Sequence, residues 1–457
     1  MNLFRYLRFH AFDGSTEDGR AAERYRLAAW ATLANVASRG TAMAVMVLSV
    51  SLTIPYLGAQ RFGIWMTVAS FATMFSFLGL GIGNALTNHV ASRAAQGDPA
   101  LLRRAISGGL ACLVLLGLAA AAGLFLLATL LPWARLIKLD DVLLLAEARD
   151  AARLFAILFG LSLLTTGIQS VFAGLQRSFE VHLASVLGSV VSLLALVLAA
   201  DRQAGIPILL AGTFGIPLLS TLFLLLVLAG RHLFSLREIR SALTQEASGL
   251  FRMGGLFFVL QVGAMIGWGA DALIISSALG PAQVAVYSVA QRLFQFLSQP
   301  LAMINGPLWG AYADAHAKGD MAFIRRTLKA SMLLTFGVAL VGALVLFASS
   351  GWLLQHWTRG ALQVPVLLIA AMAVWTILEC CGAAFAMFLN GIQVVRQQVV
   401  VVVLFCVLVL PLKIVGIAQF GLIAIPVAAV LVYALTHVYF YGFVFYPKIK
   451  SFVTSAA

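Results

Sequence analysis

Residues 94–104 of the chain read AAQGDPALLRR, and residues 316–326 read HAKGDMAFIRR. Glycine, aspartate, alanine and two arginines recur at a constant offset of 222 positions, starting from Gly97 and Asp98 in the first copy. Glycine can end a helix in a left-handed conformation, and aspartate can cap the helix that follows. Pro99 suits the first position of that helix, and the paired arginines suit the cytoplasmic end of a membrane helix. The stretch therefore predicts the same turn between two helices twice, and thus an internal repeat.

The composition indicates which solvent surrounds this repeat. The chain has 457 residues, of which 62% are hydrophobic and 10% are charged, whereas a soluble domain carries about 25% charged residues. No single globular core buries this much apolar surface, so lipid must surround most of it. The net charge of +13 fits basic cytoplasmic loops, and we expect no nucleic-acid partner. We therefore expect an all-α polytopic membrane protein.

Apolar runs long enough to cross ~30 Å of hydrocarbon predict about twelve transmembrane helices. The repeat offset covers an even number of these helices, so the two halves share one orientation and form a parallel repeat. We expect two six-helix bundles, one for each half of the repeat. The predicted parts are a basic N-terminal segment (1–26), a bundle (27–229), a basic linker (230–250), a second bundle (251–446) and a tail (447–457). The predicted spans are 27–54, 62–90, 106–131, 150–173, 181–200, 206–229, 251–278, 284–312, 328–350, 362–390, 397–418 and 421–446.

The distribution of lysine and arginine predicts the orientation. With the N-terminus inside, most of the 30 basic residues lie on the cytoplasmic side, and a minority, Lys413 among them, lie on the outer side. Arginines interrupt the first thirty residues, so these do not resemble a cleavable signal peptide. We expect a multi-pass membrane protein with both termini in the cytoplasm.

The candidate functional residues among the ionisable side chains inside the predicted spans are Arg39, Asp271, Arg292 and Glu379. Each costs about 2.5–3.5 kcal/mol at a helix centre, so such residues usually face a bundle interior or a water-filled cavity. We predict that Arg39 lines a cavity, because no acid is near it in the sequence. Asp271 and Arg292 either line the cavity or pair with each other across a short outer loop. Asp271 and Glu379 are the candidates for binding a coupling ion, H+ or Na+.

Amide side chains accompany these charges in the same spans. Each can line a substrate cavity, and each is equally explained as a hydrogen bond between helices. The candidates for the cavity are Asn35, Asn84, Asn88, Gln295 and Asn305.

Corresponding places in the two halves can also bend. Residues 79–84 read GLGIGN, and residues 301–306 read LAMING between two prolines. Glycine and proline weaken a helix, and interrupted helices at matching positions mark the binding sites of repeat transporters. Close packing of small residues explains the glycines equally well. The candidate hinge residues are Gly79, Gly81, Gly83, Pro300, Gly306 and Pro307.

Several short motifs resemble a known family. They are LGAQRFGIW at 57–65, GLGIG at 79–83, NHVA at 88–91 and GD at 97–98, with LGPAQVAVY at 279–287 in the second copy. Together they resemble the Wzx-type polysaccharide flippases of the multidrug/oligosaccharidyl-lipid/polysaccharide (MOP) superfamily. The resemblance implies two six-helix bundles around a central cavity, as in MATE-like folds, in the bacterial inner membrane. It further implies alternating access and export of an undecaprenyl-diphosphate-linked oligosaccharide, such as an O-antigen or exopolysaccharide unit, to the periplasmic leaflet. It also implies membrane lipid and polysaccharide assembly proteins as partners.

Two other functions compete with this expectation. One is a cation-coupled multidrug antiporter of the same superfamily, whose cavity should favour acids over the arginines seen here. The other is a membrane polysaccharide polymerase or glycosyltransferase, which should carry a large outer loop with reactive residues. The longest outer loop covers about 132–149, and the chain has no zinc spacing, phosphate loop or nucleophile elbow. We therefore expect a transporter rather than an enzyme, without a metal or cofactor.

Overall fold

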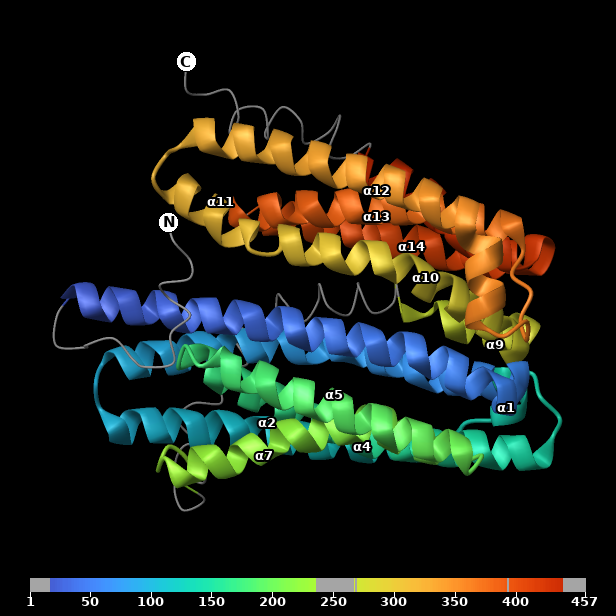
Figure 1. The fold of residues 1–457 in the computed structure, drawn as a ribbon, viewed down its shortest axis with the longest axis horizontal. Helices are drawn as coiled ribbons and strands as arrows, with labels where there is room; N and C mark the ends of the chain where they lie inside the picture. Colours follow the sequence, from blue (N-terminus) through green and yellow to red (C-terminus); the bar gives the residue numbers. More distant parts are fainter. Residues whose placement is uncertain (1–16, 236–266, 268, 393, 439–457) are drawn as a thin grey trace. The chain divides into compact units, whose positions relative to one another are not determined.

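The computed structural model describes residues 17–235, 267, 269–392 and 394–438, and within these ranges the regular structure is helical, without strands (Figure 1). The first half contains α1 (Glu17–Ala95), α2 (Pro99–Leu130), α3 (Trp133–Ile137), α4 (Val142–Gly174), α5 (Ser178–Asp201), α6 (Ile206–Leu210) and α7 (Ile216–Gly230). The second half contains α9 (Asp271–Leu279), α10 (Pro281–Asn305), α11 (Leu308–Ala317), α12 (Met321–Trp357), α13 (Val366–Gly391), α14 (Val395–Phe420) and α15 (Ala424–Tyr433). The protein is an all-α polytopic membrane protein, as predicted.

Each of the twelve predicted spans overlaps one of these helices, although much of 251–278 and the end of 421–446 lie outside the described residues. Eight helical stretches of the described part are long and apolar enough to cross a membrane. Two of the eight, Trp30–Phe71 and Gln397–His437, extend across a break in the helix. Gly58 interrupts the first with φ 67°, and Gly421 interrupts the second with φ 65°. These two stretches therefore each include parts of two predicted spans.

The turn that the repeated stretch predicts is present in both copies. Gly97 has φ 74° and Gly319 has φ 73°, a left-handed conformation that glycine adopts without steric cost. Asp98 caps α2, because its Oδ1 accepts hydrogen bonds from the backbone N–H groups of Ala100 and Leu101. The side chain of Asp320 caps α12 in the same way. The local reading of the repeated stretch is confirmed.

A second pair of glycines extends the repeat beyond that turn. Gly58 has φ 67° and ψ 175°, and Gly280, which lies 222 positions later, has φ 88° and ψ 168°. Gly58 divides α1 into two helices, and Gly280 separates α9 from α10. The same backbone conformation therefore joins the first two helices of each half.

The chain divides into two compact units, whose bounds differ from the predicted bundles at two places. The first unit contains Met1–Tyr56, Phe71–Trp133 and Asp140–Gln261, and the second contains Leu57–Ser70, Ala134–Leu139 and Val262–Ala457. Residues 57–70 and 134–139 fall inside the predicted first bundle (27–229) but pack with the second. The predicted tail (447–457) and most of the N-terminal segment (1–26) and linker (230–250) lie outside the described residues.

Close backbone contacts explain why these two segments belong to the second unit. A Cβ atom at Gly63 would lie 1.7 Å from the carbonyl oxygen of Pro281, so the two helices touch where only glycine fits. The Lys138 ammonium donates a hydrogen bond to the carbonyl oxygen of Ala278 at 2.9 Å. Long-range packing, rather than order along the sequence, assigns these segments to their unit.

Within the first unit, α2 and α4 pack along their length. A Cβ atom at Gly117 would lie 2.4 Å from the carbonyl oxygen of Gly160, so the two backbones are in contact there. The core beside this crossing includes Leu110, Ile168 and Phe172, all buried. Such small-residue crossings are typical of membrane bundles, where packing rather than hydrophobic exclusion holds helices together.

Candidate functional site

Lys413 on α14 is a buried cation in the interior of the second unit. The residue is 2% exposed, although it lies in an apolar helix. Its Nζ donates to Oδ1 of Asp271 on α9 at 2.5 Å and to the carbonyl oxygen of Gly267 at 3.2 Å. A buried ammonium requires such partners, because an unpaired charge in a low-dielectric interior costs several kcal/mol. Lys413 therefore lies in the interior of the second unit, and its predicted place toward the outer side of the membrane stays a prediction.

The other carboxylate oxygen of Asp271 is also bonded. Tyr287 on α10 is 4% exposed, and its hydroxyl donates to Oδ2 of Asp271 at 2.8 Å. Asp271 thus connects α9, α10 and α14 through one side chain. The predicted alternative in which Asp271 pairs with Arg292 is wrong, since the ion pair of Asp271 is with Lys413.

Glu379 on α13 completes this group of charges. The charges of Asp271 and Lys413 both act on its carboxylate. Glu379 makes no hydrogen bond in the part of the chain that the structure describes. When all are ionised, Asp271, Glu379 and Lys413 carry two negative charges and one positive charge. We call these three residues together with Tyr287 the ion network. With all three ionised, the network has one negative charge more than it has positive charges.

Aromatic side chains of the second unit pack around α14 near the network. Phe405 is fully buried, and Tyr433 lies edge-on to it with 6.1 Å between ring centroids. Trp375 stacks on Phe405 at 6.5 Å, and His437 stacks on Tyr433 at 3.9 Å. Apolar surroundings lower the local dielectric, so each charge of the network acts more strongly on the others than it would in water.

The predicted cavity residues of the first unit present a cation at an accessible surface. Arg39 is exposed on α1, and its Nε donates to Oδ1 of Asn35 at 3.2 Å. Its charge also acts on His182 of α5. Asn88 is exposed on the second part of α1, after Gly58. Asn84 lies on the same part, and its side chain is outside the described part of the structure. The cavity roles of Arg39, Asn35, Asn84 and Asn88 stay predictions.

The predicted cavity residues of the second unit differ from one another. Asn305 is 3% exposed, and its Nδ2 donates to Oγ1 of Thr335 on α12 at 3.0 Å. Asn305 therefore forms a hydrogen bond between helices, which is one of the two roles that the sequence left open for it. Arg292 and Gln295 are half-buried on α10, one helical turn apart. Their role in the substrate cavity stays a prediction.

The candidate hinges of the first copy lie inside a continuous helix, whereas those of the second copy include a turn between two helices. Gly79, Gly81 and Gly83 lie within the continuous second part of α1, and a Cβ atom at Gly83 would lie 2.9 Å from Oγ of Ser170. Gly83 is thus a close-packing position, which favours the packing alternative there. Gly306 and Pro307 form the turn between α10 and α11, and Pro300 lies inside α10. A helix break is therefore present in the second copy, and its role as a hinge stays a prediction.

Two members of the ion network are absent from the sequence-based candidates. Lys413 follows Pro411 in a run that is otherwise apolar. A lone lysine inside such a run indicates a buried, paired charge, and this pattern could have identified Lys413. Tyr287 gave no signal, because a tyrosine near a helix end is common at membrane interfaces.

Residues 26–309 match the model of a family described as "Polysaccharide biosynthesis protein". No curated protein matches the sequence. Among solved structures, the chain is similar to an inward-facing multidrug resistance MATE family transporter of the MOP superfamily, with a TM-score of 0.76, 14% identity and coverage of 93% of this chain and 100% of that one. An outward-facing structure of such a transporter gives a TM-score of 0.65 at 14% identity, covering 92% and 96% of the two chains. A mutant of the Vibrio cholerae MATE transporter VcmN gives 0.62 at 14% identity, covering 92% and 97%. At this identity the solved structures establish the fold alone.

Proposed function

The chain belongs to the polysaccharide biosynthesis protein family, and we propose that it is a flippase for a lipid-linked oligosaccharide. Its cargo would be an oligosaccharide on undecaprenyl diphosphate, moved from the cytoplasmic to the periplasmic leaflet of the inner membrane by alternating access. In this proposal both termini lie in the cytoplasm, where most of the basic residues would also lie. The observation that carries the proposal is the family match across the first half and into α11, on a chain with a transporter fold.

The charges of the first unit support an anionic cargo. Arg39 is an exposed arginine within the apolar stretch Trp30–Phe71 of α1, and Asn35 accepts a hydrogen bond from its Nε. A guanidinium binds phosphate oxygens through paired hydrogen bonds, which a lysine does not reproduce. We assign Arg39 to the diphosphate, and Asn35 and Asn88 to hydroxyl groups of the glycan.

The ion network supports coupling to one monovalent cation. Its two carboxylates and one ammonium leave one negative charge, and a net charge inside a bundle is costly. One proton or one Na+ would neutralise it. Asp271 is already held by Lys413 and Tyr287, so Glu379 is the group that would take up the cation. Cation binding would thereby change the charge of the network from −1 to zero during each transport cycle.

Depletion of the protein in its host tests the cargo. We expect a complete undecaprenyl-diphosphate-linked unit to accumulate on the cytoplasmic face of the membrane, because its transfer is blocked. Arg39→Ala should reproduce the block, whereas Arg39→Lys should restore it only in part. Arg104→Ala serves as the matched control, since Arg104 is exposed on the same unit and should leave export unchanged. Normal distribution of the lipid-linked unit after depletion would refute the proposal.

A cation-coupled multidrug antiporter is the second candidate, and the ion network is the feature that favours it. The solved structures of similar fold include multidrug resistance transporters. If depletion left lipid-linked units normal but raised sensitivity to cationic compounds, this second function would replace the first. Glu379→Gln tests the coupling ion separately from the cargo. For either cargo, this variant should abolish the response of transport to an ion gradient.

A further inference from the structure

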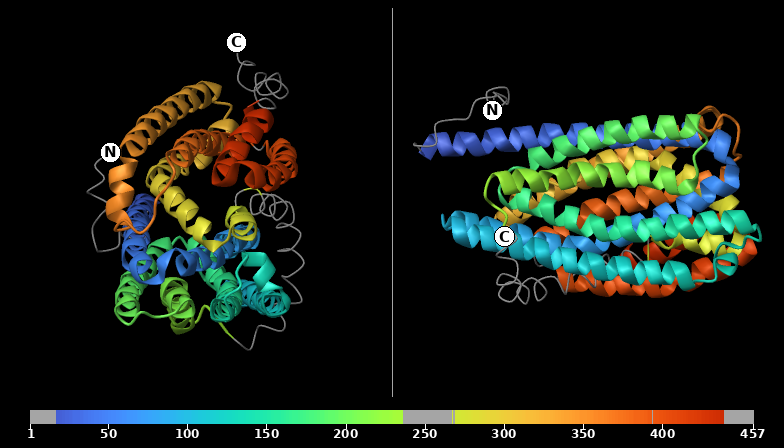
Figure 2. Two further views of the ribbon diagram at one scale, coloured as in Figure 1. Left: turned by 90° about the vertical axis from the view of Figure 1, so that its right-hand side faces the viewer. Right: turned by 90° about the horizontal axis from the view of Figure 1, so that it is seen from below.

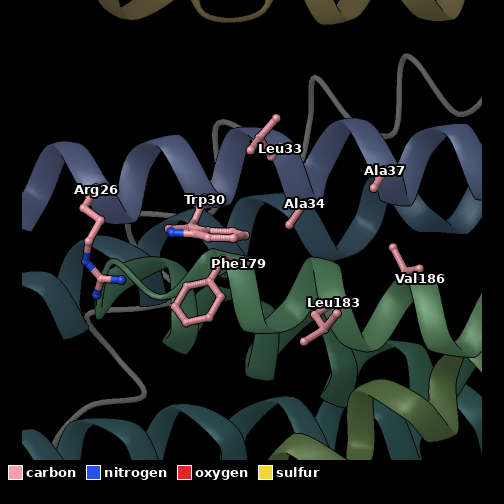
Figure 3. A pocket seen from close by; sticks show the side chains of 8 residues that line it. All are labelled: Arg26, Trp30, Leu33, Ala34, Ala37, Phe179, Leu183 and Val186. Atoms are coloured by element: carbon pink, nitrogen blue, oxygen red, sulfur yellow. The ribbon is translucent and has the colours of Figure 1, made fainter. Parts of the chain in front are cut away.

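A groove of about 600 Å³ lies between the N-terminal part of α1 and the start of α5 in the first unit. Pockets of this volume hold small organic molecules or single hydrocarbon chains. Figure 3 shows the residues of the two helices that line it, with the cationic and aromatic side chains at one end and small and aliphatic side chains along the rest. The lining residues are Arg26, Trp30, Leu33, Ala34, Ala37, Phe179, Leu183 and Val186.

The polar end of the groove coincides with the ends of two membrane spans. The apolar run of α1 begins directly after Arg26, so Arg26 lies at its edge. The span of α5 begins at Ser178, so Phe179 lies at its edge. Tryptophan and other aromatic side chains occupy the interface between hydrocarbon and headgroups. The guanidinium of Arg26 is therefore at headgroup level, with Trp30 and Phe179 just inside it.

The remainder of the groove lies at hydrocarbon depth. Leu33 and Leu183 are about half exposed, at 47% and 55%, so the walls of the groove are open apolar surface. Ala34 and Ala37 leave room for a ligand along α1, because they carry no side chain beyond Cβ. From Arg26 to Ala37 the helix rises about 16 Å, which is close to half of a ~30 Å hydrocarbon core. The groove thus has the depth of one leaflet.

From this arrangement we propose that the groove is a binding site for an anionic phospholipid of the surrounding leaflet. The headgroup phosphate binds Arg26, and one acyl chain lies along Ala34, Ala37 and Leu183. The polar-to-apolar order of the lining matches an amphiphile held along the membrane normal. Arg26 carries five N–H donors, so it can bind a phosphate beside the contacts it already makes. The proposal is independent of the cargo that the protein transports.

The dimensions distinguish this ligand from two others that carry phosphate. A free phosphate would use Arg26 but would leave the apolar part of the groove without a function. An undecaprenyl chain is far longer than one leaflet is deep, so the groove would hold only its beginning. An acyl chain of an ordinary phospholipid ends where the groove ends.

Lipid retention by the purified full-length protein tests the proposal. The protein is titrated with long-chain phosphatidylglycerol in neutral detergent, and native mass spectrometry measures the bound lipid. Phosphatidylcholine, glycerol phosphate and undecaprenyl phosphate are the comparison ligands. We expect wild-type protein to retain one phosphatidylglycerol in preference to all three.

Five variants locate the site. Arg26→Gln should weaken binding about fivefold, the usual contribution of one juxtamembrane arginine to an anionic lipid. Ala37→Leu should displace the acyl chain and lower retention without changing charge. Arg104→Gln and Ala119→Leu are the matched controls, since both residues are exposed on α2, and they should retain the lipid. Arg26→Lys keeps the charge and should bind, which separates loss of the site from loss of folding.

Three results would overturn the proposal. Equal retention of phosphatidylcholine would mean that no headgroup is recognised. Equal weakening by Arg26→Gln and Arg104→Gln would assign binding to diffuse surface charge. Preferential binding of undecaprenyl phosphate or of glycerol phosphate would identify a different ligand for the groove.

Discussion

Replacing Lys413 with methionine removes the cation of the ion network while keeping most of the length and apolar volume of the side chain. Lys413 and Asp271 are 3% and 13% exposed at their side chains, so water does not replace the lost partner. The variant leaves the carboxylates of Asp271 and Glu379 in the interior without the ammonium. Among the described residues, only Tyr287 still donates a hydrogen bond to Asp271.

The expected loss of stability follows from this burial. Removing one partner of a buried ion pair usually costs about 3–5 kcal/mol, because the other charge is left uncompensated. Replacing both partners with neutral groups of similar shape costs much less, and for some buried pairs is neutral or stabilising. We therefore expect Lys413→Met to lower the free energy of unfolding by about 3–5 kcal/mol. The double variant with Asp271→Asn should regain most of this loss.

Unfolding of the purified protein by sodium dodecyl sulfate, followed by tryptophan fluorescence, measures these free energies for the wild type, both single variants and the double variant. Lys329→Met is the matched control, because Lys329 is exposed on α12, and a surface substitution should change stability by less than about 0.5 kcal/mol. Additive effects of the two single variants would refute the pairing. So would a Lys413→Met variant as stable as Lys329→Met.

Three further substitutions test the packing and the repeat, each read from the thermal unfolding midpoint of the purified protein. Gly63→Ala places a Cβ atom 1.7 Å from the carbonyl oxygen of Pro281 and should cost about 1–3 kcal/mol as overpacking, whereas Gly123→Ala meets nothing within 4 Å and should be neutral or stabilising. Equal stability of these two variants would contradict the close contact. Gly97→Ala forces alanine to φ 74° and should cost about 1 kcal/mol, the left-handed penalty for a residue with a side chain; an unchanged midpoint would count against that turn. Asp98→Ala removes the cap of α2 and should cost about 0.5–2 kcal/mol, and Asp98→Asn, which also caps well, should recover most of it unless the aspartate has another role.

Local features of the fold were predictable because their causes are local. Helix length follows from apolar runs, and the turn at Gly97 and Asp98 follows from glycine and a capping carboxylate a few residues apart. The repeat made the second turn predictable from the first, at Gly319 and Asp320. Both sets of turns are seen at the expected positions.

Contacts between helices were not predictable in the same way. The partner of Asp271 lies 142 positions away, and the choice between Arg292 and Lys413 depends on how α9, α10 and α14 are rotated about their axes. A membrane helix surrounded by lipid shows weak amphipathicity, so its sequence does not state which face is buried. Asn305 illustrates the same difficulty, since an amide on a membrane helix suits a cavity and an interhelical hydrogen bond equally.

The sequence by itself determined that this chain is a duplicated helical membrane protein, because lipid imposes apolar length and backbone hydrogen bonding on every span. It also determined the turns of the repeat, since glycine and aspartate act on their immediate neighbours. Only the tertiary structure decided that residues 57–70 and 134–139 pack with the second unit. Only the tertiary structure, likewise, brought Lys413 to Asp271 and Tyr287. The physical reason is that such contacts depend on the close packing of helices far apart in the chain, and a buried charge takes whichever partner that packing places within hydrogen-bonding distance.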